Sequence, residues 1–314
     1  MCSHAMHAAS TEALMSEQNR PVLPVAVLVL ALLGVAFGSI FVRLASAPAL
    51  AMAAWRVGIA ALVVVPLAWA RSSGPVPAVA QRQAFAAGLL LALHFATWIQ
   101  SLTYISVSAS VVLVTTSPVW VVVLSWLFRL GAPQPRQLAA VALSVLGSAV
   151  IGGASLLAGL ESFRGALLAL DGAVCMGGYL LLARACQRKL CFLAFVARSY
   201  GAAAAVLWIA ALASGTPMVG FPPRTWLAFA GAALASQLVG HGGYNWALRH
   251  LDPVFVGIVL VGEPVLASAL AWWLFGESVA PATWVGGALI LAGVATGFSA
   301  GRVADQNPQG ARTT

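Results

Sequence analysis

The sequence predicts an all-α, polytopic membrane protein, and its composition and residue pattern are the observations that indicate this fold class. Of its 314 residues, 61% are hydrophobic and 8% are charged, whereas soluble domains contain roughly a quarter charged residues. The hydrophobic residues fall in blocks of about 20, the length of helix that crosses a bilayer. The blocks lack a consistent polar face, which lipid-facing helices do not need. We therefore expect the bilayer to be the solvent.

Cutting the sequence at charges and at proline or glycine clusters gives ten expected membrane-spanning helices. Their ranges are 23–43, 50–70, 83–104, 107–128, 137–156, 165–184, 192–213, 225–248, 254–275 and 281–300. The third and fourth come from one uncharged run that we divide at a tight turn near residues 105 to 107. Residues 1–22 are expected to form a disordered cytoplasmic leader, with Met15 as an alternative start, and residues 301–314 a cytoplasmic tail.

Basic residues indicate the orientation of these helices, because loops retained in the cytoplasm are enriched in arginine and lysine. With the N-terminus inside, the cytoplasmic side receives Arg20, Arg71, Arg82, Arg129, Arg136, Arg184, Arg188, Lys189, Arg249, Arg302 and Arg312. The other side receives Arg43, Arg164 and Arg224. Eleven basic residues against three predict cytoplasmic termini. We expect a bacterial inner membrane, with anionic lipid headgroups beside the basic loops.

An internal repeat emerges when the chain is compared with itself at an offset of 146 residues. Residues 98–151 then align with residues 244–297. The informative coincidences are Pro118 with Pro264, Trp126 with Trp272, Pro135 with Pro281, and Gly147 with Gly293. Earlier in each half the register shifts slightly, and Arg56 corresponds to Arg198. The sequence therefore predicts two repeats, over residues 23–156 and 157–300.

Each predicted repeat contains five spans, and this odd number determines their relative orientation. After five crossings the chain lies on the opposite side, so the second repeat must enter the membrane from that side. The expected architecture is thus an inverted repeat. Transporters that work by alternating access use this architecture, because exchanging the conformations of the two halves exposes a central site to the other side.

Short motifs add a resemblance to a known family. The second half contains Leu260-Val-Gly-Glu-Pro-Val265 and Trp273-Leu-Phe-Gly-Glu-Ser278, and the first half contains the related Thr116-Ser-Pro-Val119. Together with the duplicated layout, these motifs resemble the EamA-type ten-helix members of the drug/metabolite transporter superfamily. One difference is Gly131-Ala132, where the family often has Gly-Glu. Members of that family export amino acids, other metabolites or drugs, so the resemblance implies a transporter without specifying its solute.

Glu263 is the first candidate functional residue, because a carboxyl at membrane depth is costly unless it is protonated, paired or hydrated. Pro264 follows it and has no amide hydrogen, so the helix can kink there. Pro118 provides the matching break in the first half, and paired breaks indicate a central site. Alternatively, Pro264 only shapes the helix and Glu263 hydrogen-bonds a neighbouring helix. Proton coupling through Glu263 is a further hypothesis.

Two groups of ring and amide side chains are candidates for a cavity wall that binds a solute. They are His94, Trp98 and Gln100 in the third span, and His241, Tyr244 and Asn245 in the eighth. Spacings of three and four residues place His241, Tyr244 and Asn245 on one helix face, and His94 with Trp98 on another. Such strips suit a solute with apolar and polar parts. The alternative is ordinary packing, with each histidine neutral and bonded to a backbone carbonyl.

Three charged residues within spans could take part in gating or charge pairing. Arg56 and Arg198 lie about two turns inside their spans, from opposite membrane faces, as an inverted pair should. The simplest interpretation is that both extend to the interface; gating or binding of a solute carboxylate is the alternative. Asp171 lies about two turns into the sixth span from the outer side, where it could pair with a base or line an outer vestibule.

These patterns exclude several classes of protein. The cysteines, which are Cys2, Cys175, Cys186 and Cys191, lack metal-type spacing and are expected to be reduced. No cofactor, metal or nucleic acid is predicted, and no glycine-rich phosphate loop indicates ATP-driven pumping. An integral-membrane enzyme would need a nucleophile with a base or paired acids, yet Asp171 and Glu263 are the only acids within the expected spans and occupy different ones.

The function predicted from the sequence is secondary transport. We expect an exporter of a small metabolite, such as an amino acid or related compound, that works by alternating access and is either proton-coupled or uncoupled. An integral-membrane enzyme and a passive facilitator or channel-like protein remain the alternatives. The expected partners are a small-molecule solute, membrane lipids and protons. A monomer and a homodimer are both compatible with the sequence.

Overall fold

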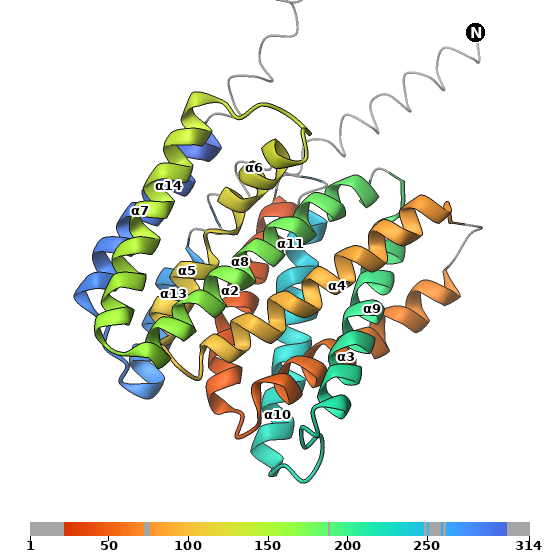
Figure 1. Ribbon diagram of the computed structural model, residues 1–314. Coiled ribbons are helices and arrows are strands. Elements are labelled where there is room, and N and C mark those ends of the chain that lie inside the picture. The colour runs from red at the N-terminus through yellow and green to blue at the C-terminus, as the bar shows by residue number, and fades with distance from the viewer. Residues whose placement is uncertain are drawn as a thin grey trace, which may run out of the picture.

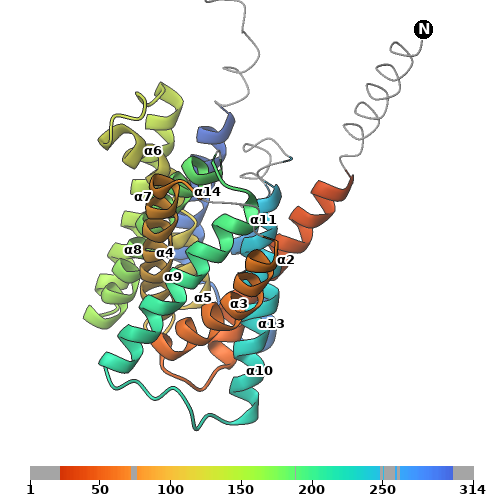
Figure 2. The same ribbon diagram turned by 90° about the vertical axis from the view of Figure 1, so that its right-hand side faces the viewer.

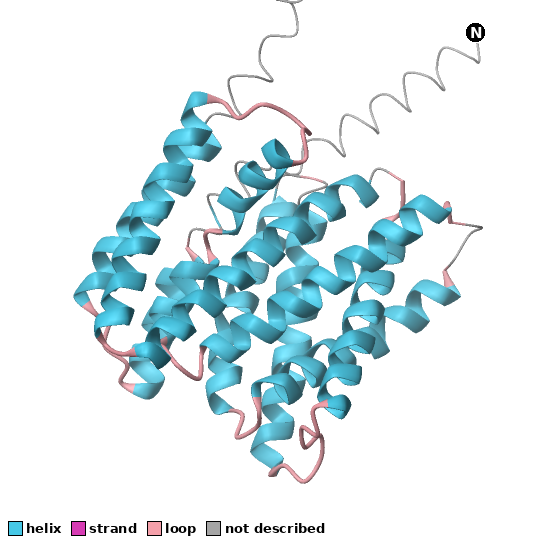
Figure 3. Cartoon of the chain, in the orientation of Figure 1, coloured by secondary structure: helices cyan, strands magenta, loops and turns pink. Residues whose placement is uncertain are grey.

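The computed structural model describes residues 22–71, 76–187, 189–247, 250, 259 and 262–299, and all regular structure in this part of the chain is helical (Figure 3). The expected leader up to residue 21, the tail, and most of the first half of the expected ninth span lie outside the described residues. The predicted fold class is confirmed by the helical elements within them.

Ten helical segments correspond to the ten expected spans. They are α2 (Val22–Leu44), α3 (Ala49–Ala70), α4 (Ala78–Ser101), α5 (Val107–Val114) with α6 (Ser117–Leu127), α7 (Pro135–Leu157), α8 (Leu160–Gln187), α9 (Phe192–Ala213), α10 (Pro223–Gly231) with η1 (Ala232–His241) and α11 (Gly242–Ala247), α13 (Glu263–Phe275), and α14 (Pro281–Ser299). Seven of these segments are long and apolar enough to cross a membrane, and α13 and α14 are shorter apolar helices.

Two helices begin well before the start that the sequence predicted. The third begins at Ala78 instead of residue 83, and the sixth covers Leu160–Gln187 instead of 165–184. In both cases arginines that the sequence placed just outside a span lie inside the helix. A charged side chain marks where a helix leaves the hydrocarbon, and backbone hydrogen bonding can continue into the headgroup region.

The fourth span is broken in the middle, between α5 and α6. Pro118 lies at the start of α6 and cannot donate the hydrogen bond that the carbonyl of Val114 would accept in a continuous helix. The hydroxyl of Ser117 donates to that carbonyl instead, at 2.6 Å. In the other half, α13 likewise begins one residue before its proline, at Glu263. The two prolines thus occupy equivalent helix starts.

The two halves pack against each other through several pairs of helices. In Figure 1, α14 lies beside α7, and the main further contacts are of α8 with α4, α9 with α3, and η1 with α2. Exchanging each span with its counterpart in the other half reproduces this set of pairs. The bundle therefore has the two-fold relation that an inverted repeat requires.

The contact between α7 and α14 shows that relation at the level of atoms. A Cβ atom added to Gly147 would collide with the carbonyl oxygen of Gly286, and one added to Gly293 would lie 2.8 Å from the carbonyl oxygen of Ala140. At the offset of 146, Gly147 corresponds to Gly293 and Ala140 to Gly286. Small residues allow helix backbones to approach closely in membranes, and here both copies of the contact use them.

The bundle has two ends, which we name by the direction of α2. The proximal end, where α2 begins, includes α6; the distal end, where α2 finishes, includes α10, and these two helices lie at opposite edges in Figure 2. The described basic residues toward the proximal end are Arg71, Arg82, Arg129, Arg136, Arg184 and Lys189, and those toward the distal end are Arg43, Arg164 and Arg224. The chain is a multi-pass membrane protein.

Candidate functional site

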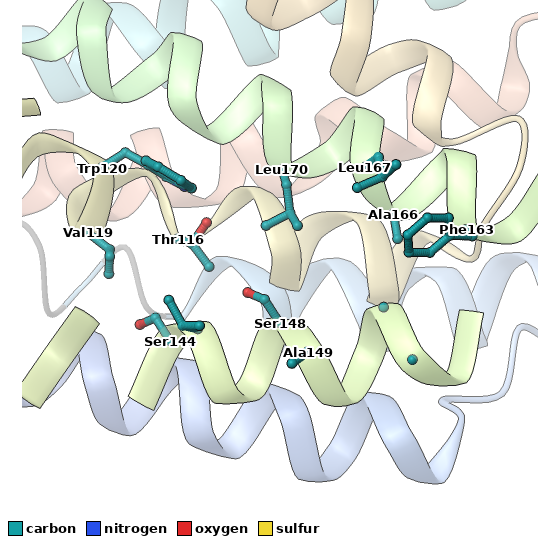
Figure 4. Close-up of a pocket in the computed structure, with 13 residues that line it drawn as sticks. Thr116, Val119, Trp120, Ser144, Ser148, Ala149, Phe163, Ala166, Leu167 and Leu170 are labelled. Atoms are coloured by element: carbon teal, nitrogen blue, oxygen red, sulfur yellow. The ribbon is translucent and has the colours of Figure 1, made fainter. Parts of the chain in front are cut away.

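The hollows in the bundle differ in chemistry. One, of about 410 Å³, lies beside α7 and α8 and is lined by apolar side chains and small hydroxyls, including Leu170, Phe163 and Ser148 (Figure 4). Another, of about 330 Å³, has a mainly apolar lining from α2, α9 and the eighth span. A smaller one, of about 140 Å³, is central and is lined from both halves. The central cavity combines charged, ring and amide side chains, so it is the candidate functional site.

The lining of the central cavity includes most of the residues that the sequence singled out. It consists of Val35, Arg56, His94, Trp98, Val114, Thr115, Ser117, Pro118, Met176, Tyr179, Leu180, His241, Tyr244, Asn245 and Glu263. Both helix breaks contribute, through Pro118 at the start of α6 and Glu263 at the start of α13. The residues come from helices far apart in the sequence, and only the packing of the halves brings them together.

Arg56 differs most from its simplest interpretation. It does not extend to the membrane interface, because its side chain is buried, with 1% exposed. Its Nε donates to Oε1 of Gln237 at 3.0 Å. The guanidinium carbon lies 4.2 Å from the centroid of the Phe95 ring and 5.7 Å from that of Trp98. An amide acceptor and two aromatic faces therefore hold this charge inside the bundle.

Gln237 lies on a π-helix that the sequence analysis missed. The segment η1 covers Ala232–His241, in the middle of the eighth span. Wider turns of this kind are uncommon and are often found at functional sites. The carbonyl of Gln237 accepts from the hydroxyl of Tyr200 at 3.3 Å. A sequence signal did exist: Gln237 is polar in an apolar span and precedes His241 by four residues.

The two histidines meet across the interface of the halves. The ring of His94 lies 6.4 Å from that of His241, measured between centroids, and is stacked near Trp98 at 6.0 Å. His94 Nδ1 is 2.8 Å from the carbonyl oxygen of Gly172. A carbonyl can only accept, so Nδ1 carries the hydrogen and Nε2 remains for another partner. His94 thus makes the bond to a backbone carbonyl that the packing alternative expected. It also lines the central cavity.

The remaining polar residues of the eighth span have different surroundings. Asn245 donates from Nδ2 to the Tyr179 hydroxyl at 3.1 Å, so it links α11 to α8. The hydroxyl of Tyr244 is buried and has no hydrogen-bond partner among the described residues. Glu263 is partly buried and interacts electrostatically with both Arg56 and Tyr244. The cavity wall therefore contains one cationic and one acidic group.

Four predicted site residues lie outside the cavity lining. Gln100 donates to the hydroxyl of Thr103 at 2.9 Å, at the distal end of α4. Arg198 donates to the carbonyl of Ala194 in its own helix at 3.0 Å. Asp171 is exposed on α8, and Pro264 is buried at the start of α13. All four residues lie on helices that the sequence predicted. They are outside the cavity lining because of where their side chains point.

An ion pair at the distal end was also missed by the sequence analysis. Nη2 of Arg43 lies 3.1 Å from Oε1 of Glu277, which joins the end of α2 to the end of α13. The same nitrogen donates to the carbonyl of Ile105 at 2.9 Å, and Oε2 of Glu277 accepts from the amide of Val107 at 2.9 Å. We call these four residues the distal latch, because they connect the first, fourth and ninth spans.

Metal chemistry has no ligand set in the described part of the chain, where no group of three or more histidine, cysteine, aspartate or glutamate side chains could hold an ion. The cavity instead offers hydrogen-bond donors, ring faces, one guanidinium and one carboxylate. Such a set can bind a small polar solute and exchange it with water.

The sequence pattern of the EamA-like transporter family matches residues 22–153 and 163–297, which together are most of the chain. The chain belongs to the EamA-like transporter family. The resemblance to the drug/metabolite transporter superfamily is thereby confirmed. Members of this family are typically not enzymes, so this EamA protein is a transporter whose solute and coupling the match does not specify.

Solved structures share the fold of this EamA protein, and nineteen of their chains match it. One, titled "Crystal structure of protein", has 20% sequence identity and a TM-score of 0.62, over 89% of this chain and 98% of that chain. A search of curated proteins returned no match.

Proposed function

We propose that this EamA protein exports a small polar metabolite, such as an amino acid or related compound, by alternating access. The observation that carries the proposal is the central cavity, which both halves line, with Arg56 from the first half and Glu263 from the second. Charged groups at membrane depth are costly and mark solute or ion pathways. Their position at the interface of two inverted halves is where alternating-access transporters bind solute.

The size of the cavity favours a small solute over a bulky drug. Its volume is about 140 Å³, whereas cavities for drug-sized ligands measure roughly 300–1,000 Å³. The larger hollow beside α7 and α8 has an apolar lining, with no charged residue among those that form it. It suits lipid chains better than a polar solute.

The distal latch supports a cycle in which one end of the pathway is closed. It ties α2 and α13 to the start of α5 on the distal side of the cavity. Opening toward the distal end requires breaking the pair of Arg43 and Glu277, and an exposed or partly exposed pair of this kind costs little to break, about 1 kcal/mol. A latch of that strength holds one state without trapping the protein in it.

The basic residues support a cytoplasmic proximal end and a bacterial inner membrane. The side chains of Arg71, Arg82 and Arg129 would contact the anionic headgroups of the cytoplasmic leaflet. On this orientation the distal latch closes the outer side of the pathway, and the solute enters the cavity from the cytoplasm. The energy source, such as a proton gradient, then sets the net direction of solute transport.

Glu263 is the group that we propose for proton coupling. Among the described residues it is the only carboxylate that lines the central cavity, and it starts a helix whose Pro264 allows the backbone to bend. A carboxyl that alternates between water and a low-dielectric interior can bind a proton in one state and release it in the other. Uncoupled exchange is the alternative.

An enzymatic function has no support in the arrangement of the cavity. The candidate nucleophile is the hydroxyl of Ser117, and it donates to the carbonyl of Val114 in its own chain. A serine nucleophile needs a neighbouring base within hydrogen-bond distance instead. No described residue provides that second contact to Ser117.

Transport by purified protein in liposomes tests this proposal. Vesicles would be loaded with labelled amino acids, hydroxy acids or amines, and efflux would be measured with and without a pH gradient. We expect saturable efflux that an excess of the same unlabelled solute outside accelerates, because a single alternating site exchanges one molecule for another. Flux that neither saturates nor exchanges would indicate a passive channel. No flux of any solute class would contradict the proposal.

A further inference from the structure

Four buried hydrogen-bond donors around the central cavity have no partner among the described residues. They are Nη1 of Arg56, Nε1 of Trp98, Nε2 of Gln237 and the hydroxyl of Tyr244. They come from α3, α4, η1 and α11, and three of the four residues line the cavity. The concentration of unpaired donors at one place, contributed by both halves, is the observation from which we argue.

Such donors are costly to leave unpaired inside a protein, and a guanidinium nitrogen is the most costly of them. Side chains buried as deeply as those of Arg56 and Trp98, which are 1% and 4% exposed, cannot obtain the missing bonds from bulk water in this state. Native proteins satisfy nearly all such groups. The missing partner is therefore expected to be a molecule that enters the cavity.

The geometry of the donors specifies the kind of acceptor. Arg56 already uses Nε for Gln237, and its ring contacts fix the guanidinium plane, so the Nη1 edge remains for the ligand. The Trp98 ring lies 5.7 Å from the guanidinium carbon, and its Nε1–H is a second unpaired donor from the wall of the same cavity. A planar group with two acceptor oxygens can accept from a guanidinium and from a further N–H donor of that wall.

Glu263 does not provide that acceptor. It lines the same cavity, but no ion pair within 4.0 Å joins it to Arg56. The Glu263 carboxylate instead interacts electrostatically, at longer range, with both Arg56 and Tyr244. A solute in the cavity would therefore meet both a cation and an acid.

We propose that the transported solute carries a carboxylate, and that Arg56 Nη1 and Trp98 Nε1 bind it. A second polar group of the solute, an ammonium or hydroxyl, faces Glu263 and Tyr244. This inference rests on the proposed transport function and adds the subsite and the class of solute. A phosphate monoester fits less well, because its second negative charge would have only one arginine and would be repelled by Glu263.

Equilibrium binding to the purified protein tests the subsite independently of transport. The probes are the twenty common L-amino acids, each paired with its α-carboxamide, together with lactate and O-phosphoethanolamine. We expect at least one carboxylate to bind, and its uncharged counterpart to bind at least about ten-fold more weakly, which is about 1.4 kcal/mol. Equal affinity of acid and amide, binding by no carboxylate, or tighter binding of the phosphate would overturn the inference.

Variants assign the carboxylate to its donors. Arg56→Gln should reduce the affinity for the acid to that for the amide and leave the affinity for the amide unchanged. The matched control is Arg198→Gln, which removes the same charge from the equivalent place in the other half, where the guanidinium donates to its own helix. We expect this control to bind the acid as the unmodified protein does, and an equal loss in both variants would overturn the assignment.

A second variant keeps the test decisive if Arg56→Gln does not fold. Trp98→Phe retains an aromatic ring beside Arg56 but removes Nε1–H, so it should weaken binding of the acid about five-fold, as expected for one charge-assisted bond, and leave the amide unaffected. Unchanged affinity for the acid in Trp98→Phe would remove Trp98 from the subsite. Binding without flux in liposomes would contradict the transport function and leave the carboxylate subsite supported.

Discussion

The two halves of this EamA protein have the same scaffold and different chemistry. Glycine contacts between α7 and α14 occur in two equivalent copies, and both halves place a proline at the start of a helix near the cavity. The carboxylates and the surroundings of the equivalent arginines are not repeated. Ser117 stands where the second half has Glu263, Arg198 turns to its own helix while Arg56 is buried, and Glu277 has no acidic counterpart at Gly131.

This difference indicates which features the inverted architecture must keep in both halves. Alternating access exchanges the conformations of the halves, so packing surfaces and helix breaks have to match. A solute, in contrast, is bound in one orientation and needs each charge once. Since a charge at membrane depth is costly, a second copy without a partner would only destabilise the protein.

Replacing the glycines of the repeated contact should have the largest effect, and an equal one in both halves. Gly147→Leu and Gly293→Leu each place a side chain where a carbonyl oxygen of the other helix lies. We expect the yield of folded protein to fall about ten-fold or more. Size-exclusion chromatography in detergent measures it. Gly152→Leu is the control, because its Cβ would meet nothing within 4 Å; unequal losses for Gly147 and Gly293 would show that the halves are not packed equivalently.

Moving the carboxylate from one half to the other should show that the chemistry is not interchangeable. Glu263→Ser should reduce transport about 100-fold, as expected when a charged group that contacts solute is lost. The double variant Ser117→Glu, Glu263→Ser contains the same two side chains with their positions exchanged between the halves. We expect no recovery in liposome efflux, because Arg56 remains in the first half. Recovery to near the original rate would contradict the distinction between the halves.

Ser117 should contribute to stability in a way that its counterpart does not. Its hydroxyl donates to the carbonyl freed by Pro118, so Ser117→Ala leaves that carbonyl unpaired. We expect a loss of about 1 kcal/mol in the free energy of unfolding, read from denaturation in mixed micelles. The control is Ser148→Ala, on the wall of the larger hollow beside α7 and α8. No loss in Ser117→Ala would mean that the broken helix does not need this bond.

The distal latch should have the smallest effect, because an ion pair of this kind contributes at most about 1 kcal/mol. Glu277→Gln should open the distal end more often, since Arg43 and the amide of Val107 lose their charged partner. The reporter is a cysteine at Val114 in the cavity wall, in a background without the native cysteines. Labelling from the distal side should accelerate roughly two- to five-fold, and labelling from the proximal side should not accelerate.

The sequence predicted the ten spans and the repeat because both depend on local or periodic properties. A block of apolar residues is hydrophobic whichever helix it meets, and the offset of 146 survives in the prolines and glycines that packing requires. The ring residues of the third and eighth spans, His94 with Trp98 and His241 with Tyr244, could be grouped because helix periodicity places neighbours on one face. The same reasoning identified Glu263, since a carboxyl in an apolar block is conspicuous.

What the sequence could not determine depends on contacts between helices that are distant in the chain. Arg56 and Arg198 are alike in sequence, but Arg56 faces the amide of Gln237 and the ring of Phe95, whereas Arg198 donates to the carbonyl of Ala194 in its own helix. The π-helix that carries Gln237 was likewise not predicted from the sequence. The sequence determined where the helices are and which charges lie within them. Only the tertiary structure decided which of those charges is enclosed, because enclosing a charge requires an acceptor and an aromatic face supplied by another helix.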